Sequence, residues 1–261
     1  MKLFYREVGT GGPAIVILHG LFGMSDNWMS FARRLEKDFH LYLLDLRNHG
    51  RSPHSAEMNY DVMAGDVADF IGGTIGSSCS VVGHSMGGKV AMKLAMEQGG
   101  LIQSLVSVDI APKKYYTTQF RDFLRVMMGM DLSRLTGRGQ ADRILEEALG
   151  LPPATRQFLL KNIYRDEHNR FQWRANLMAL YDNLELLLDG LRGGGQYDGP
   201  VLFTRGTESP YIKEEDLPLM RSFFPSAHIV DIPGANHWVH ASAPAALEKA
   251  LREFWNNVNC H

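Results

Sequence analysis

A chain of 261 residues, 45% of them hydrophobic, is long enough for one large domain, with or without an insertion, and can bury a sizeable core. Its formal net charge of −2 gives no electrostatic reason to expect a nucleic acid or an anionic membrane as a partner. Two cysteines, Cys79 and Cys260, do not make a disulfide framework, and no segment has the pattern of a signal peptide or a membrane span. Unless a targeting segment was removed before Met1, we expect a cytoplasmic protein without membrane insertion. The sequence leaves the oligomeric state open.

Apolar strands alternate with amphipathic helices in the first half of the chain, which predicts a mostly parallel sheet with helices on both faces. The glycine-rich stretch at 9–13 lacks a Gly-Lys-Ser/Thr ending and a following helix, so it favours a hairpin turn over a nucleotide-binding loop. In chain order, the predicted elements are strands at 2–8 and 14–18, a helix at 28–37, a strand at 41–44, a helix at 60–75 and strands at 79–82 and 101–108.

The strand pattern disappears between residues 112 and 199. Helical periodicity replaces it at 119–128, 141–149, 154–164 and 173–191, and the later part of the chain then returns to strands at 201–205 and 228–232 and helices at 214–223 and 244–258. Open α/β sheets bind ligands at the C-terminal ends of their strands, so a helical insertion here would cover the site. We expect an α/β core domain at 1–111 and 200–261, with a helical cap at 112–199.

Residues 83–88, Gly-His-Ser-Met-Gly-Gly, follow a short apolar strand and precede a helix-forming run at 89–97. A nucleophilic serine on a strained strand-to-helix turn needs neighbouring glycines, because the backbone turns sharply and the hydroxyl must stand clear. Chance alone can produce Gly-x-Ser-x-Gly in a chain with 26 glycines. The flanking strand and helix nevertheless make Ser85 the predicted nucleophile.

A serine hydroxyl needs a general base to take its proton. We expect His237 to be that base, since it lies between the last predicted strand and the last predicted helix, at the same edge of the sheet as Ser85. His84 is predicted to pack, His49 to be structural and His240 to shape the His237 loop. His19 belongs to the turn described next. The remaining histidines have no supporting context, and they are His40, His54, His168, His228 and His261.

Acyl transfer also needs two backbone N–H groups that bind the oxyanion. One usually belongs to the residue after the nucleophile and the other to a loop after an earlier strand. Met86 and Leu21, the latter in the glycine-flanked turn at 19–23, are the predicted donors, with Phe22 as a weaker alternative to Leu21.

The acid that would orient the base is not where most enzymes with this kind of elbow have it, after the strand that corresponds to 201–205. The loop there is Gly-Thr-Glu-Ser, and its Ser209 cannot supply a charge. Asp109 ends the strand next to the one that leads to the nucleophile. Neighbouring strands lie about 4.8 Å apart, so this carboxylate can meet a histidine from the last loop. Alternatively Asp109 only caps the start of the insertion, with Glu208 as the leading substitute acid and Asp231 as a distant one.

With these residues the chain resembles the α/β-hydrolase fold superfamily and, more narrowly, the YbfF-like esterases. The resemblance implies that Asp109 is the acid and Ser209 a supporting residue in the usual acid's place. It also implies hydrolysis of short acyl esters, and of acyl thioesters, without a cofactor. The motifs that carry it cover nearly the whole chain and lie at 19–23, 45–50, 83–89, 109–112, 205–211 and 237–241.

The predicted function is therefore that of a serine esterase that acts through an acyl-enzyme on Ser85, with a small-molecule acyl ester or thioester as its partner. The sequence has no His-Glu-x-x-His or Cys-x-x-Cys motif, so we expect no metal. One alternative is a carbon–carbon bond hydrolase or lyase on the same scaffold, and another is a slow-turnover small-molecule receptor. Dehalogenases and epoxide hydrolases are disfavoured because they carry a carboxylate nucleophile.

Two groups of residues in the predicted cap have open roles. Apolar stripes would either line an acyl pocket or seat the cap on the core, and they comprise Phe120, Phe123, Leu124, Met127 and Met128, then Leu177, Leu180, Tyr181 and Leu184. A basic cluster would either meet coenzyme A phosphates or, as we favour, form a solvated face, and it comprises Lys113, Lys114, Arg121 and Arg125.

Overall fold

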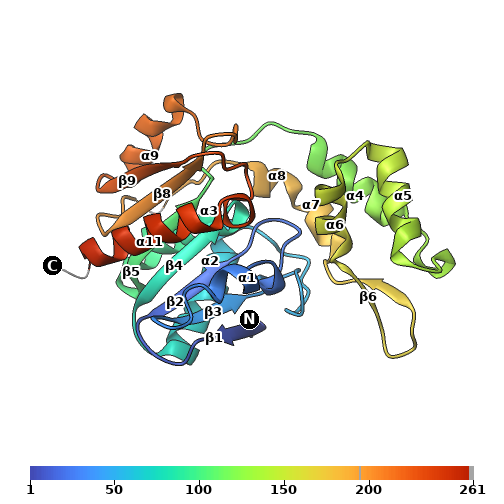
Figure 1. Ribbon diagram of the computed structural model, residues 1–261, viewed down its shortest axis with the longest axis horizontal. Coiled ribbons are helices and arrows are strands. Elements are labelled where there is room, and N and C mark those ends of the chain that lie inside the picture. The colour runs from blue at the N-terminus through green and yellow to red at the C-terminus, as the bar shows by residue number, and fades with distance from the viewer. Residues whose placement is uncertain (194, 259–261) are drawn as a thin grey trace.

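The computed structural model describes residues 1–193 and 195–258, so Cys260 and His261 lie outside the described residues. A seven-stranded sheet forms the centre of the protein, with helices on both faces, and confirms the predicted mostly parallel α/β architecture (Figure 1). Only β1 runs antiparallel to its neighbour. In sheet order the strands are β1 (Tyr5–Val8), β3 (His40–Leu44), β2 (Ala14–Leu18), β4 (Cys79–His84), β5 (Ile102–Val108), β8 (Val201–Gly206) and β9 (Ala227–Ile232).

The central strands are almost continuously apolar because both faces of the sheet are covered. Successive side chains point to opposite faces, so Val16 and Leu18 of β2 pack into one core while Ile15 and Ile17 pack into the other. This arrangement explains why these strands lack the polar alternation of a half-exposed sheet.

Helices α2 (Tyr60–Phe70) and α3 (Met86–Gln98) contribute to one core, and α1 (Met29–Ala32) and α11 (Pro244–Val258) to the other. Helix α11 buries Leu247, Leu251 and Phe254, the spacing of an amphipathic helix. No helix in the described part of the chain is both long and apolar enough to cross a membrane. The remaining short elements outside 112–199 are α9 (Leu217–Phe223), α10 (Val239–Ser242) and single turns at Ser25–Asn27, Ile71–Ile75, Gly99–Leu101 and Glu214–Asp216.

The sequence pattern predicted a purely helical 112–199 segment, and this prediction is wrong in part. The segment contains a two-stranded hairpin of β6 (Ile163–Arg165) and β7 (Phe171–Trp173), which replaces the end of one predicted helix and the start of the next. Three-residue strands are too short to show a period of two in the sequence. The elements of this segment lie to one side of the sheet in Figure 1, and they are α4 (Gln119–Gly129), a turn at Leu132–Arg134, α5 (Arg138–Leu149), α6 (Pro153–Leu160), β6 (Ile163–Arg165), β7 (Phe171–Trp173), α7 (Leu177–Asp182) and α8 (Leu184–Leu188).

The predicted hairpin between the first two strands is also wrong, because β3 lies between β1 and β2. Ala14 pairs with His40 in a parallel register, so β2 is hydrogen-bonded to β3 and not to β1. The turn at 9–13 packs instead against the loop before β3, where a Cβ on Gly12 would lie 2.0 Å from the carbonyl oxygen of Asp38. A glycine-rich turn serves a hairpin and a longer crossing equally well, so its composition does not distinguish them.

The order of the strands reverses beside β2, which has β3 on one side and β4 on the other. Such a reversal opens a crevice at the C-terminal ends of the two strands, since their connections leave in opposite directions. The loops after β2 and β4 flank this crevice. They are the glycine-flanked turn at 19–23 and the turn that carries Ser85.

Candidate active site

Ser85 occupies the sharp turn between β4 and α3, with φ 53° and ψ −120°. Backbone comes so close here that only glycine fits on either side. A Cβ on Gly83 would lie 2.2 Å from the carbonyl oxygen of Gly87, and a Cβ on Gly87 would lie 2.5 Å from that of Leu18. The Ser85 N–H donates to the carbonyl oxygen of Val108, at 3.1 Å. The turn therefore has the geometry of a nucleophile elbow.

Two cavities meet at Ser85, of about 270 Å³ and about 580 Å³. Leu21 and Phe120 line both of them. Met86 and Lys89 line the smaller cavity, whereas His237 lines the larger one. A substrate bonded to Ser85 can therefore extend in two directions, and only one of these passes the histidine.

Asp109 lies fully buried directly after β5, with φ 54°, and its carboxylate joins three groups of the site. Oδ2 accepts from Nδ1 of His237, at 2.7 Å, and from the hydroxyl of Ser209, while Oδ1 accepts from the N–H of Gly206 at 3.1 Å. An ionised carboxylate only accepts hydrogen bonds, so the proton of a neutral His237 ring is on Nδ1. Nε2 is then left with a lone pair.

The other two candidate acids lie elsewhere. Asp231 accepts from Arg205, at 2.6 and 2.9 Å, on a partly exposed part of β9. Glu208 has an exposed side chain that lines the larger cavity, and its backbone N–H donates to the carbonyl oxygen of Ala235. Among the described residues, Asp109 is the only one of the three whose carboxylate is hydrogen-bonded to His237.

Two residues that support His237 could not be assigned from the sequence. Nε2 of His84 donates to the carbonyl oxygen of His237, at 2.8 Å, and burial lowers the pKa of His84 well below its usual value. The ring of Tyr211 stacks on the His237 ring, with centroids 3.6 Å apart and an angle of 10° between planes. His84 was predicted only to pack. The sequence signal for Tyr211 was its place in the motif at 205–211.

Tyr115 connects the strand end that carries Asp109 to the loop that carries Ser209. Its hydroxyl accepts from the N–H of Ala111 and donates to the carbonyl oxygen of Tyr211, both at 2.9 Å. The position of the His237 ring therefore depends on the start of the 112–199 segment as well as on the last loop.

The turn at 19–23 lies against the elbow because Gly20 has no side chain. A Cβ on Gly20 would lie 3.2 Å from Cβ of Ser85. The N–H of Phe22 donates to Nε2 of His49, at 3.2 Å, so this group already has a partner. The N–H of Leu21 belongs to a residue that lines both cavities beside Ser85.

Two buried neutral histidines hold this turn in place. Nδ1 of His19 donates to the carbonyl oxygen of Gly20, at 2.8 Å, and Nε2 accepts from the N–H of Leu46, at 3.0 Å. His49 similarly donates from Nδ1 to the carbonyl oxygen of Arg47, at 3.0 Å. Burial lowers the pKa of His19 to about 4 and that of His49 to about 3.

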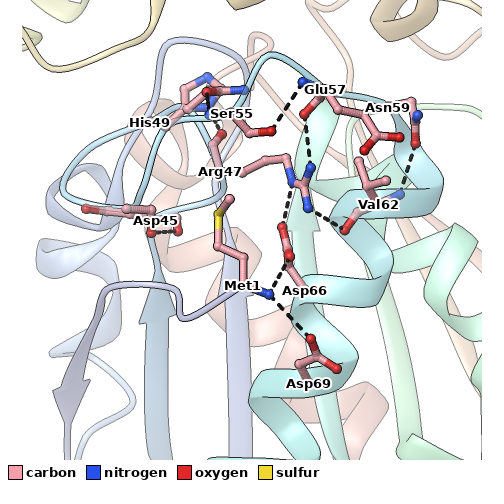
Figure 2. A network of polar contacts seen from close by, with 12 residues as sticks. Met1, Asp45, Arg47, His49, Ser55, Glu57, Asn59, Val62, Asp66 and Asp69 are labelled. Carbon is pink, nitrogen blue, oxygen red and sulfur yellow. Dashed lines mark hydrogen bonds and ion pairs between the residues drawn. The ribbon is translucent and has the colours of Figure 1, made fainter.

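Arg47 anchors the turn that presents His49 (Figure 2). Its Nε donates to the carboxylate of Asp66 in α2, at 2.6 Å, and its terminal nitrogens donate to the carbonyl oxygens of Glu57 and Val62. The amino group of Met1 contacts the other carboxylate oxygen of Asp66, at 3.0 Å. The Arg-Asn-His turn thus positions the turn at 19–23 through His49.

The apolar stripes of α4 and α7 are largely buried, and these two helices pack against each other. Leu124, Met127 and Leu180 are fully buried. Of the predicted stripe residues, Phe120 and Phe123 line the described cavities at Ser85.

The basic cluster is largely paired. Lys113 contacts Asp216 at 2.6 Å, and Arg121 contacts Glu185 at 2.7 Å. These ion pairs fit the favoured prediction of a solvated face, although Lys113 is partly buried. In the described part of the chain, no group of three or more His, Cys, Asp or Glu side chains could hold a metal ion.

A serine on an elbow beside a cavity, a histidine held by a buried carboxylate and a mostly parallel sheet define a hydrolase of the α/β type. The family model described as "alpha/beta hydrolase fold" matches residues 13–244, and the chain belongs to this family.

Curated relatives and solved structures agree with this assignment. The chain is 41% identical to a Xenopus tropicalis protein named sn-1-specific diacylglycerol lipase ABHD11, over 88% of this chain and 74% of that protein. It is 36% identical to Esterase YbfF of Escherichia coli, over 93% of both. A solved structure titled "Marine microorganism esterase" matches with a TM-score of 0.93 and 38% identity, over 97% of this chain and 99% of that one.

Proposed function

We propose that the protein is a serine esterase that hydrolyses small acyl esters through an acyl-enzyme on Ser85. One observation carries the proposal. The elbow serine and a histidine paired with a buried carboxylate line the same cavity. The relatives named as an esterase and a lipase support the reaction class. We further propose that 112–199 acts as a cap on a core formed by 1–111 and 200–261.

The reaction follows from the positions of the groups. Nε2 of His237 takes the proton of Ser85 as the hydroxyl attacks the ester carbonyl, and the imidazolium then protonates the leaving alcohol. Asp109 stabilises the imidazolium, and Ser209 adds a neutral hydrogen bond to the same carboxylate oxygen. Water hydrolyses the acyl-enzyme by the same base.

Two backbone N–H groups would hold the oxyanion, those of Met86 and Leu21. Met86 begins α3, where the N–H groups of the first turn have no partner within the helix. Leu21 is preferred over Phe22 because the N–H of Phe22 is engaged by His49.

The proposal is tested by labelling with a fluorophosphonate, together with turnover of p-nitrophenyl esters. We expect one label per chain, mapped by mass spectrometry to Ser85, and steady turnover that the Ser85→Ala variant loses. A label on another residue, or an active Ser85→Ala enzyme, would refute the mechanism. A single turnover without steady release would instead indicate a receptor, and cleavage of vinylogous diketones but not of esters a carbon–carbon bond hydrolase.

The second expectation concerns the length of the acyl chain that the enzyme accepts. The smaller cavity has a volume of only about 270 Å³ and is lined in part by Tyr60 and Leu187, so the enzyme should prefer short acyl chains to long triglycerides. The measurement is kcat/KM across p-nitrophenyl esters of increasing length, and of the matching thioesters. A rate that climbs steadily beyond about ten carbons, with interfacial activation, would contradict this pocket size.

A further inference from the structure

Lys89 is a buried cation in the wall of the smaller cavity, one helical turn after Ser85. The residue is 1% exposed. Ser85 precedes α3 directly, Lys89 lies in the first turn of the helix, and both residues line the smaller cavity. The ammonium donates one hydrogen bond, to the carbonyl oxygen of Asp189 at 2.6 Å.

The charge of Lys89 is only partly compensated. Among the described residues, no carboxylate oxygen lies within 4.0 Å of Nζ. The rings of Tyr115 and Tyr60 present their faces to it, with centroids at 4.9 and 5.4 Å. An ammonium has three donors, and burying one without a counter-charge is costly.

The other polar groups of this cavity are either hydrogen-bonded within the protein or less buried than Lys89, and Ser85 and Tyr211 are half-buried. The hydroxyl of Tyr60 donates to the carbonyl oxygen of Leu187, at 2.6 Å, and that of Tyr115 donates to the carbonyl oxygen of Tyr211. Thr117 and Gln119 are exposed. Lys89 is therefore the buried polar group that has donors left for a ligand.

The smaller cavity suits the acyl part of a substrate. The histidine that protonates the leaving alcohol must lie on the alcohol's side of the ester, and His237 lines the larger cavity. The acyl chain then extends from Ser85 into the smaller cavity, between Met86 and Lys89.

We propose that the smaller cavity binds acyl groups that end in a carboxylate, and that the Lys89 ammonium recognises this carboxylate. The substrates would be monoesters of short dicarboxylic acids. The inference rests on the proposed esterase function and names a substrate class for it. A charge-assisted hydrogen bond to this buried ammonium supplies the selectivity.

Lys93, one turn further along α3, provides a matched control. It is also buried and also donates to a backbone carbonyl after α8, that of Arg192 at 3.0 Å. Unlike Lys89, it contacts two carboxylates, those of Asp61 and Glu97, both at 2.7 Å. It lines neither cavity at Ser85. Both lysines thus fasten α3 to the same loop, but only Lys89 faces the substrate.

The test compares monoethyl succinate, glutarate and adipate with ethyl esters in which an isopropyl group of the same shape replaces the carboxylate. The measured quantity is the ratio of kcat/KM for the charged and the neutral ester. Lys89→Met should lower this ratio by about tenfold or more, the value of a hydrogen bond to a charged group. Lys93→Met should leave the ratio within about twofold of the wild type.

Proton binding gives a second readout. Burial lowers the pKa of Lys89 to about 7, while Asp189 raises it and Lys113 lowers it further. The wild-type ratio should therefore be constant from about pH 5.5, where the substrate carboxylate is ionised, to about pH 7 and fall above it, and in Lys89→Met it should be flat over the same range. Ionisations that both substrates share cancel in the ratio. The other ionisable groups packed around Nζ are the phenols of Tyr60 and Tyr115, and burial raises the pKa of both.

Two outcomes would overturn the inference. In one, the wild type prefers the isopropyl esters by tenfold or more and Lys89→Met does not change the preference. In the other, each of the variants Lys89→Met and Lys93→Met lowers kcat/KM for the charged and the neutral ester by the same factor. That result is expected if both lysines only hold α3 against the loop after α8. If the wild type hydrolyses neither ester, the proposed function itself has failed.

Discussion

Replacing Asp109 by asparagine is expected to lower kcat for ester hydrolysis by about three to four orders of magnitude. Three donors converge on this carboxylate, from His237, Ser209 and Gly206. An amide has only one accepting oxygen, so its NH₂ group must face at least one of these donors. If it faces Nδ1 of His237, it favours the tautomer that carries the proton on Nε2, which cannot accept the serine proton. The neutral amide also leaves the imidazolium without a counter-charge. Steady-state kinetics on p-nitrophenyl acetate, with a melting curve to confirm folding, measures the loss.

Two neighbouring variants serve as comparisons for Asp109→Asn. Ser209→Ala should cost only about ten- to a hundredfold, because it removes a neutral hydrogen bond and keeps the charge. Glu208→Gln should be nearly silent, since its side chain is exposed and it is the carboxylate of Asp109 that is hydrogen-bonded to His237. A folded, active Asp109→Asn enzyme beside a disabled Glu208→Gln enzyme would move the role of the acid to Glu208.

Lowering the pH below 6.5 should destabilise the fold steeply. Burial depresses the pKa of His19 to about 4 and those of His49 and His240 to about 3, and it also lowers that of His84. The unfolded chain binds these protons near pH 6.5 and the folded chain does not. Stability is therefore complete above pH 6.5 and declines as the pH falls toward 4. Each such histidine contributes up to about 1.4 kcal/mol per pH unit.

Four histidines together can remove roughly 5–10 kcal/mol between pH 6.5 and 4.5, which is comparable to the whole stability of a typical domain. Urea denaturation at several pH values measures the slope. His240→Phe is the informative variant, because the His240 ring stacks on Trp28, with centroids 4.1 Å apart, and phenylalanine can keep that stack without binding a proton. Its slope should fall by about a quarter. A free energy of unfolding that stays constant over this range would show that these histidines titrate normally in the fold.

The elbow and the strand end that carries Asp109 could be predicted from the sequence, because each depends on residues close to it along the chain. The elbow needs Gly83 and Gly87 for steric reasons that hold for any serine on such a turn. The position of Asp109 at a strand end next to β4 followed from the alternation of strands and the spacing between neighbours.

The parts that depend on distant neighbours could not be predicted. A single turn at 9–13 does not reveal that β3 enters between β1 and β2. Stacking of Tyr211 on His237 joins two loops that meet only in the fold. Lys89 has the residue type of a solvated helix position, and nothing in its neighbours along the chain signals that the 112–199 segment covers it.

The hydrogen bonds of Lys89 and Lys93 to the loop after α8 set the crossover points for chimaeras of this enzyme. Both acceptors, the carbonyl groups of Asp189 and Arg192, precede the end of the 112–199 segment. Gly190 fixes the path of this loop, because a Cβ there would lie 3.2 Å from the backbone of Pro112 and Lys114. A donor segment that replaces residues 112–188 keeps the native loop that accepts hydrogen bonds from Lys89 and Lys93. A donor segment that extends to residue 199 replaces this loop. Exchanging specificity between relatives therefore calls for the shorter graft.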